Sequence, residues 1–128
     1  MEPATPSGGQ PDVGIQPNIA GLLCYLPCCG LLLSAVAVIV ERRNAFVRFH
    51  SLQGLLLNGT SLVVLGAFSA AEFLLGWFNL GTVAEALSWL KVVVLVGTVV
   101  LDAILMLKAY DGEEYALPVF GALGRQWV

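Results

Sequence analysis

Three long apolar runs constrain this chain more than any other feature of its sequence. They cover about residues 18–40, 51–77 and 83–107. At about 1.5 Å per helical residue, each run can cross a hydrocarbon core of about 30 Å. The 128 residues are 58% hydrophobic and 12% charged, whereas soluble domains are about 45–50% apolar and about 25% charged. The sequence therefore predicts an all-α integral membrane protein, with three transmembrane helices packed as a compact bundle over residues 18–128.

The two ends of the chain differ from its apolar runs. Residues 1–17 are rich in Pro and Gly and contain no Lys or Arg, so they predict a disordered tail rather than a secretory signal, which needs a basic segment. Pro27 interrupts the first run. We favour a kinked helix that passes straight through the membrane over a re-entrant hairpin, because each half of a hairpin would have only about ten residues. Helical spacing near the C-terminus predicts a short interfacial segment at Phe120, Leu123, Gly124 and Trp127.

Lysine and arginine near the ends of the runs indicate an orientation, because such residues are enriched on the cytoplasmic side. The N-terminal tail and the turn at residues 77–82 contain neither type. Five cations flank the other helix ends: Arg42, Arg43, Arg48, Lys108 and Arg125. With three passes, this bias predicts a multi-pass protein of the inner membrane, with its N-terminus outside and its C-terminus in the cytoplasm.

Small and polar residues form a stripe along the second and third runs, which is typical of faces that pack against other helices. If the turn centres near residue 80, the antiparallel register places Asp102 level with Asn58 and Lys91 within reach of Glu72. An isolated charge deep in lipid costs about 2.5–3.5 kcal/mol on insertion scales, so each should have a partner. Asp102 is expected to pair with Asn58 or to be protonated.

These intramembrane polar residues have two interpretations. Lys91 and Asp102 fit a proton or ion pathway, or a lock that fixes the register of two helices. Three helices leave no room for a pore, which favours the lock. The cysteines in the first run (Cys24, Cys28 and Cys29) are typical small apolar fillers, so no metal site is expected. No nucleophile–base pair, phosphate loop or basic patch with interleaved aromatics indicates an enzyme or a nucleic-acid-binding protein.

The stretch FVRFHSLQ, residues 46–53, places aromatic and polar side chains together at the start of the second run. Four of them share one helix face, so they should meet something together. That body is either the same chain near Tyr110, which the register places level with His50, or a partner subunit. His50 is the one candidate ligand for a haem or pigment metal, although no cofactor is expected. The proposed anchor or partner motif comprises Phe46, Arg48, Phe49, His50 and Gln53.

The same stretch, preceded by VIVERRN and followed by YALPVFG, resembles a family of small uncharacterised bacterial integral membrane proteins with an FVRFHAxQ-like motif. That family is distantly similar to the twenty-kilodalton component of the chloroplast inner-envelope import translocon. The resemblance covers about residues 18–124, and the cysteines of CYLPCCG depart from it. It implies a helical membrane protein without known catalysis, and a shared polar anchor at Arg48, His50 and Gln53. The matching positions are Asn44, Phe46, Val47, Arg48, Phe49, His50, Gln53, Tyr115, Pro118 and Gly121.

The function predicted from the sequence is that of a structural or interaction subunit of a larger membrane complex, without enzymatic activity. Two alternatives stay open: a channel or translocation component, and an accessory subunit that holds a pigment or haem. The expected partners are membrane lipids and other membrane-protein subunits, with no nucleic acid.

Overall fold

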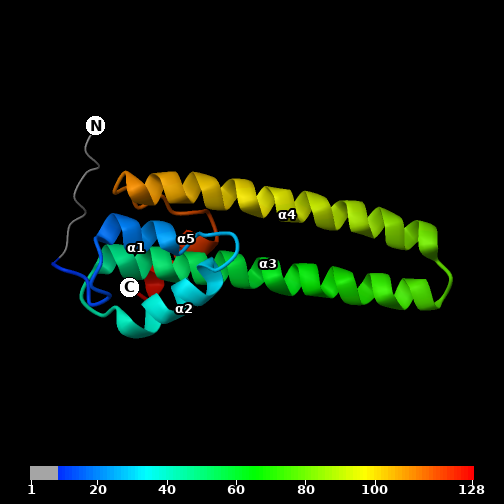
Figure 1. Ribbon diagram of the computed structural model, residues 1–128, viewed down its shortest axis with the longest axis horizontal. Coiled ribbons are helices and arrows are strands. Elements are labelled where there is room, and N and C mark those ends of the chain that lie inside the picture. Colours follow the sequence, from blue (N-terminus) through cyan, green and yellow to red (C-terminus); the bar gives the residue numbers. More distant parts are fainter. Residues whose placement is uncertain (1–8) are drawn as a thin grey trace.

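The computed structural model describes residues 9–128, and these residues form five helices and no strands. Two long helices, α3 and α4, make an antiparallel hairpin, and the three shorter helices gather around its open end (Figure 1). This open end is termed the head, and the opposite end the hairpin tip. In chain order the helices are α1 (Pro17–Leu23), α2 (Gly30–Val40), α3 (Ala45–Trp77), α4 (Gly81–Tyr110) and α5 (Phe120–Gln126).

Helices α3 and α4 are the two described helices that are long and apolar enough to cross a membrane. The side chain of Asn44 caps α3 by accepting a hydrogen bond of 3.1 Å from the Val47 amide. At the tip, Asn79 adopts a left-handed conformation, with φ of 57°, which asparagine tolerates better than most residues. The tight turn therefore sends α4 back beside α3, as the antiparallel hairpin predicted from the sequence requires.

The first apolar run is not one helix, so the predicted continuous span over residues 18–40 is wrong. Helix α1 ends at Leu23, residues 24–29 form turns, and α2 runs back toward the head (Figure 1). Pro27 lies in this break, where it lacks an N–H donor and disfavours helix at the residue before it. With 7 and 11 residues, α1 and α2 are only about 10 and 16 Å long, and neither can cross the membrane alone.

Local and long-range hydrogen bonds satisfy the backbone at this break. The Gly30 amide donates to the Leu26 carbonyl at 2.7 Å, and the Ser34 hydroxyl donates to the Cys24 carbonyl at 2.8 Å. Irregular backbone is tolerated at membrane depth where the protein itself satisfies its polar groups. The first run is therefore a pair of short helices that reverses direction at the break and packs against α3 and α4.

The reversal brings both described ends of the chain to the head. Asn44 donates to the Gly9 carbonyl at 2.9 Å, Asn18 donates to the Tyr110 carbonyl at 2.8 Å, and the C-terminal Trp127 carbonyl accepts from Arg48 at 2.9 Å. The predicted arrangement, with the two ends on opposite sides, is therefore wrong for the described residues. Residues 9–16 of the predicted disordered tail form turns and bends that contact residues 41–44, and Pro17 begins α1. Residues 1–8 of that tail lie outside the described range.

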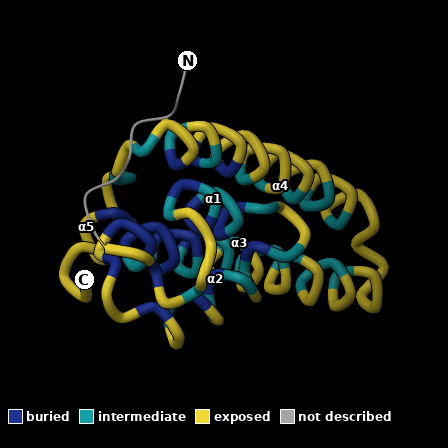
Figure 2. The backbone as a smooth tube through the Cα atoms, turned by 60° about the vertical axis from the view of Figure 1, so that its left-hand side comes forward, coloured by how far each residue is buried: buried dark blue, intermediate teal, exposed yellow. Residues whose placement is uncertain are grey.

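Burial separates the head from the hairpin. Buried positions concentrate where α1, α2 and α5 surround α3 and α4, while both long helices beyond the head are largely exposed (Figure 2). The last buried residue of α3 is Leu57, and the first buried residue of α4 is Asp102. Helix α5 coincides with the predicted C-terminal segment and packs against α3 through Gly121 and Gly124.

Close approach at Gly54 lets the broken segment pack against α3. A Cβ atom at this position would lie 2.7 Å from both the Cys24 carbonyl oxygen and the Ser34 hydroxyl. Gly66, in the same helix, has no neighbouring atom within 4 Å of the equivalent point. A side chain can therefore be added at one glycine of α3 and not at the other.

We predict that Gly54→Ala lowers the free energy of unfolding by about 1–3 kcal/mol, the range expected for overpacking a well-packed core. Gly66→Ala is the matched control, and it should leave stability unchanged or raise it by up to about 1 kcal/mol through helix propensity. Thermal or denaturant unfolding in a mild detergent measures both. Equal stability of the two variants would contradict the close crossing at Gly54.

Candidate functional site

The loop before α3 is organised by Glu41, a residue that sequence analysis did not single out. Its carboxylate is buried and accepts hydrogen bonds from the amides of Asn44 at 2.8 Å and Arg43 at 3.0 Å. It also accepts a longer bond from the Val13 amide, at 3.3 Å. Asn44 then caps α3. In the sequence, a glutamate followed by two arginines is typical of a solvated loop. The hydrogen bonds from backbone amides to Glu41 show its structural role.

A buried polar cluster, formed by Tyr25, His50 and Gln53, lies at the centre of the head. The Tyr25 hydroxyl lies 2.9 Å from His50 Nδ1 and accepts from Gln53 Nε2 at 3.0 Å. Gln53 also donates to the Tyr115 carbonyl at 3.0 Å, and its Oε1 accepts from the Leu117 amide at 2.9 Å. This one carboxamide therefore joins the break after α1, helix α3 and the segment between α4 and α5.

His50 sits within an aromatic enclosure. The ring centroids of Phe46, Phe49 and Tyr25 lie 4.4, 5.2 and 5.6 Å from the imidazole centroid, all in edge-on geometry. Nε2 is buried without a hydrogen bond of standard geometry, and the backbone of Glu113 interacts with the ring. The imidazole is fully buried. Side chains of its own chain therefore surround the ring.

The residues predicted to form an anchor or partner motif are brought together, but they face the interior of their own chain. Phe46, Phe49, His50 and Gln53 are each at most 2% exposed. Arg48 is only partly buried and bonds to the C-terminal Trp127 carbonyl rather than to the carboxylates near residue 113. Of the two bodies expected from the sequence, the internal one describes the contacts of these side chains.

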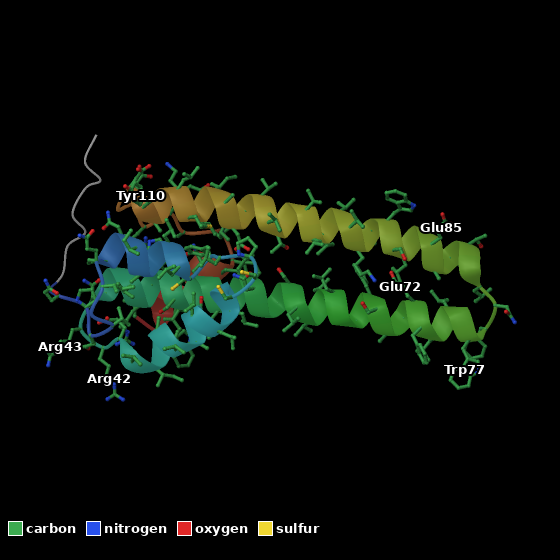
Figure 3. The ribbon with its side chains drawn as sticks, in the orientation of Figure 1. Arg42, Arg43, Glu72, Trp77, Glu85 and Tyr110 are labelled. Carbon is green, nitrogen blue, oxygen red and sulfur yellow. The ribbon has the colours of Figure 1, made fainter. Side chains whose placement is uncertain are left out.

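The register places His50 level with Tyr110, but the hydrogen bonds of both residues go to the first apolar run instead. Tyr110 lies at the head end of α4 (Figure 3), and its carbonyl binds Asn18 instead. His50 turns toward Tyr25, which comes from the broken segment. The antiparallel register relates α3 to α4 and does not define the height of a first span against them. The contact between Tyr25 and His50 could therefore not be predicted from the sequence.

Along the hairpin, the polar side chains of α3 and α4 meet each other at the levels predicted from the antiparallel register. Lys91 Nζ forms an ion pair with Glu72, whose other carboxylate oxygen accepts from Ser88 at 2.9 Å. Glu72 points from α3 into the space between the two helices (Figure 3). Asn58 donates to Asp102 Oδ1 at 3.4 Å, a long hydrogen bond. These contacts agree with an inter-helix lock, and no functional role follows from them alone.

Asp102 lines a cavity of about 190 Å³ at the boundary between head and hairpin. Helices α3 and α4 form its walls, and the break in the first run and the start of α2 contribute Pro27, Cys28 and Leu31. The polar lining residues are Cys28, Asn58, Ser61, Thr98 and Asp102.

The three cysteines all lie in the break but differ in exposure. Cys24 is buried and donates to the Ala20 carbonyl at 3.3 Å, whereas Cys28 is exposed and Cys29 partly exposed. Over residues 9–128, no group of three or more His, Cys, Asp or Glu side chains is arranged to hold a metal ion.

Comparison with known proteins indicates a membrane family. Residues 16–123 match the magnetosome magnetite crystal formation protein family. Two UPF0132 membrane proteins of Methanocaldococcus jannaschii are similar to the chain: the first is 32% identical over 93% of this chain and 94% of the relative, the second 30% identical over 90% and 72%. No solved structure matches. These relatives support a small membrane protein family; they are archaeal, where the sequence resemblance pointed to bacterial proteins.

The polar cluster makes Gln53 sensitive to a nearly isosteric change. We predict that Gln53→Glu destabilises the protein by about 2–5 kcal/mol, because the new carboxylate cannot donate to the Tyr115 carbonyl and adds an unpaired buried charge. Gln126→Glu, at an exposed position of α5, is the control and should be neutral. Melting in detergent compares them; a stable Gln53→Glu protein would mean that the amide does not hold the head together.

The ion pair of the hairpin can be tested by a double-mutant cycle. Lys91→Leu should be more destabilising than the double change Glu72→Leu/Lys91→Leu, because the single change leaves a carboxylate unpaired in an apolar environment. Detergent melting of the wild type, both single variants and the double variant gives the coupling energy. A coupling energy of zero would show that the two side chains do not interact.

Proposed function

The chain belongs to the magnetosome magnetite crystal formation protein family, and we propose that it acts as a non-enzymatic structural or interaction subunit of a larger membrane complex. The two archaeal relatives are also membrane proteins. The crystal-formation role is part of the family's description, and the proposal for this chain rests on its own surfaces.

The observation that carries the proposal is the exposed apolar surface of the hairpin. Val63, Phe73, Trp89 and Val93 are between 65% and 71% exposed. Large apolar side chains exposed along the same helices mark surfaces that contact membranes or other proteins. The polar side chains of the same helices face each other, so lipid tails and neighbouring transmembrane helices would meet an apolar exterior.

The dimensions of the hairpin support its insertion into the bilayer. With 33 and 30 residues, α3 and α4 are about 50 and 45 Å long, so about 30 Å of each can cross the hydrocarbon core while the rest stays in the head. Arg42 and Arg43 extend outward from the head (Figure 3). Five of the six Lys and Arg residues belong to the head side, and the tip turn has none. We assign the head to the cytoplasmic side of the inner membrane, with the tip outside.

The alternatives receive less support. A single chain has two long helices packed directly against each other, so transport through a pore would need several copies or another subunit. The packing around His50 does not favour a cofactor-holding subunit. A role in translocation within a larger assembly stays compatible with the interaction proposal, and the exposed hairpin would then be its contact surface.

This topology predicts that both termini lie in the cytoplasm. Tags placed before Met1 and after Val128 should react with membrane-impermeant reagents only after the inner membrane is opened, whereas a cysteine at Asn79 in the tip should react in intact cells. Exposure of the N-terminal tag alone in intact cells would restore the three-pass arrangement.

The interaction role predicts specific protein contacts at the hairpin surface. A photo-crosslinking amino acid at Val63, which is 71% exposed, should give a discrete protein adduct in native membranes, whereas the same residue at Leu105, which is 0% exposed, should give none. The side chain at Leu105 packs against its own chain and cannot reach a neighbour. If Val63 gives only lipid adducts in cells that express the protein at its natural level, the subunit proposal fails.

A further inference from the structure

The cavity beside Asp102 gathers oxygen atoms at a depth where a membrane protein rarely places them. Asn58 and Ser61 come from α3, and Thr98 and Asp102 come from α4. Each pair is in contact across the helices: Asn58 Nδ2 lies 3.4 Å from Asp102 Oδ1, and Ser61 Oγ lies 3.1 Å from Thr98 Oγ1. The two pairs lie at successive levels along the hairpin, and all four residues line the same cavity of about 190 Å³.

The charge of Asp102 has no positive partner among the described residues. The side chain is 1% exposed, and its one hydrogen bond is the long contact from Asn58. The nearest cation along α4 is Lys108, about 9 Å away at 1.5 Å per residue, and it is already paired with Glu113. Lys91, about 16 Å away in the other direction, is paired with Glu72. A carboxylate buried in this way needs a counter-charge or a proton, because an isolated charge deep in a membrane is unfavourable by several kcal/mol.

The two hydroxyl groups make three contacts with only two protons between them. Ser61 Oγ donates to the Leu57 carbonyl at 2.8 Å, and Thr98 Oγ1 donates to the Val94 carbonyl at 2.9 Å. Each hydroxyl has one proton. While both backbone bonds are made, no proton remains for the 3.1 Å contact between the two oxygens, and their lone pairs face each other. A cation beside them would relieve this contact.

We propose that this cavity binds a small monovalent cation, Na⁺ in competition with H⁺, on the carboxylate of Asp102. Asn58 Oδ1 and the hydroxyl oxygens of Ser61 and Thr98 supply further ligands. Oxygen ligands suit hard cations, and one carboxylate balances one positive charge. Broken helices near the middle of the membrane form cation sites in transporters, and here the break at Pro27 and Cys28 covers the cavity. The inference rests on the membrane placement proposed above for the hairpin.

A hydrophobic carbodiimide tests the site, because it reacts with protonated carboxyl groups inside a membrane. The full chain is reconstituted in liposomes and treated with dicyclohexylcarbodiimide in NaCl or in choline chloride at equal ionic strength. The adduct is located by mass spectrometry. We expect a single intramembrane adduct at Asp102 that forms more slowly as the pH rises and that Na⁺ suppresses several-fold, and Asp102→Asn should abolish it. Glu72→Gln is the control and should leave the adduct unchanged.

The ligand role of the hydroxyl groups has its own variants. Ser61→Ala with Thr98→Val should weaken the protection by Na⁺ several-fold while labelling in choline stays as in the wild type. Labelling of Asp102 that Na⁺ does not affect at any pH would overturn the cation site, and so would the absence of an Asp102 adduct. As a second measurement, Na⁺ should raise the melting temperature of the wild type and not that of Asp102→Asn. The Val63 crosslink should persist in Asp102→Asn, so failure of this site and failure of the subunit role are distinguishable.

Discussion

The carboxamide of Gln53 is the interaction on which the arrangement of the head depends. It uses both ends of one buried side chain to bind the Tyr25 hydroxyl, the Tyr115 carbonyl and the Leu117 amide. Tyr25, Tyr115 and Leu117 lie in irregular segments outside the helices. No regular pattern of backbone hydrogen bonds therefore connects them to α3. Buried polar groups are destabilising when they lack partners. Loss of the Gln53 carboxamide would remove all three hydrogen bonds at once. With them in place, the break in the first run and the segment before α5 both have fixed positions against α3.

From this head the two long helices extend with few other neighbours. Their polar residues contact each other, and many of their large apolar residues are exposed. Beyond the head, both helices are largely exposed along their length (Figure 2). In water this surface would be unfavourable, while in lipid it is the normal exterior of a transmembrane hairpin. The same separation defines the candidate functions: an apolar surface for lipids and neighbouring helices, and one buried carboxylate where the hairpin enters the head.

The sequence predicts the part of this structure that follows from local rules. The hairpin, its tip near Asn79 and the pairing of Lys91 with Glu72 all follow from helical periodicity and one antiparallel register. The first run was misjudged because its length alone fits a span. Its reversal depends on Ser34, whose hydroxyl donates to the Cys24 carbonyl, and on Gly54, which lets that carbonyl approach α3 closely. No local pattern shows these contacts.

The shared face of Phe46, Phe49, His50 and Gln53 was likewise predictable, whereas its partner was not. A helix face indicates that something covers it, and the identity of the cover is a long-range property of the fold. Tyr25 supplies that cover together with the segment after α4. Glu41 is a comparable case, since its partners are backbone amides that have no signature in the sequence.

The central claim is that the first apolar run turns back inside the membrane and returns both described ends of the chain to the head. A distance between spin labels at Ile15 and Asp111, introduced as non-natural amino acids so that the cysteines stay unchanged, tests it most directly in liposomes. The hydrogen bond of 2.8 Å between Asn18 and the Tyr110 carbonyl predicts a label separation within about two helix diameters, ~20–25 Å. A first run that crosses the membrane would instead separate the labels by about 33 Å or more, and that result would contradict the re-entrant fold.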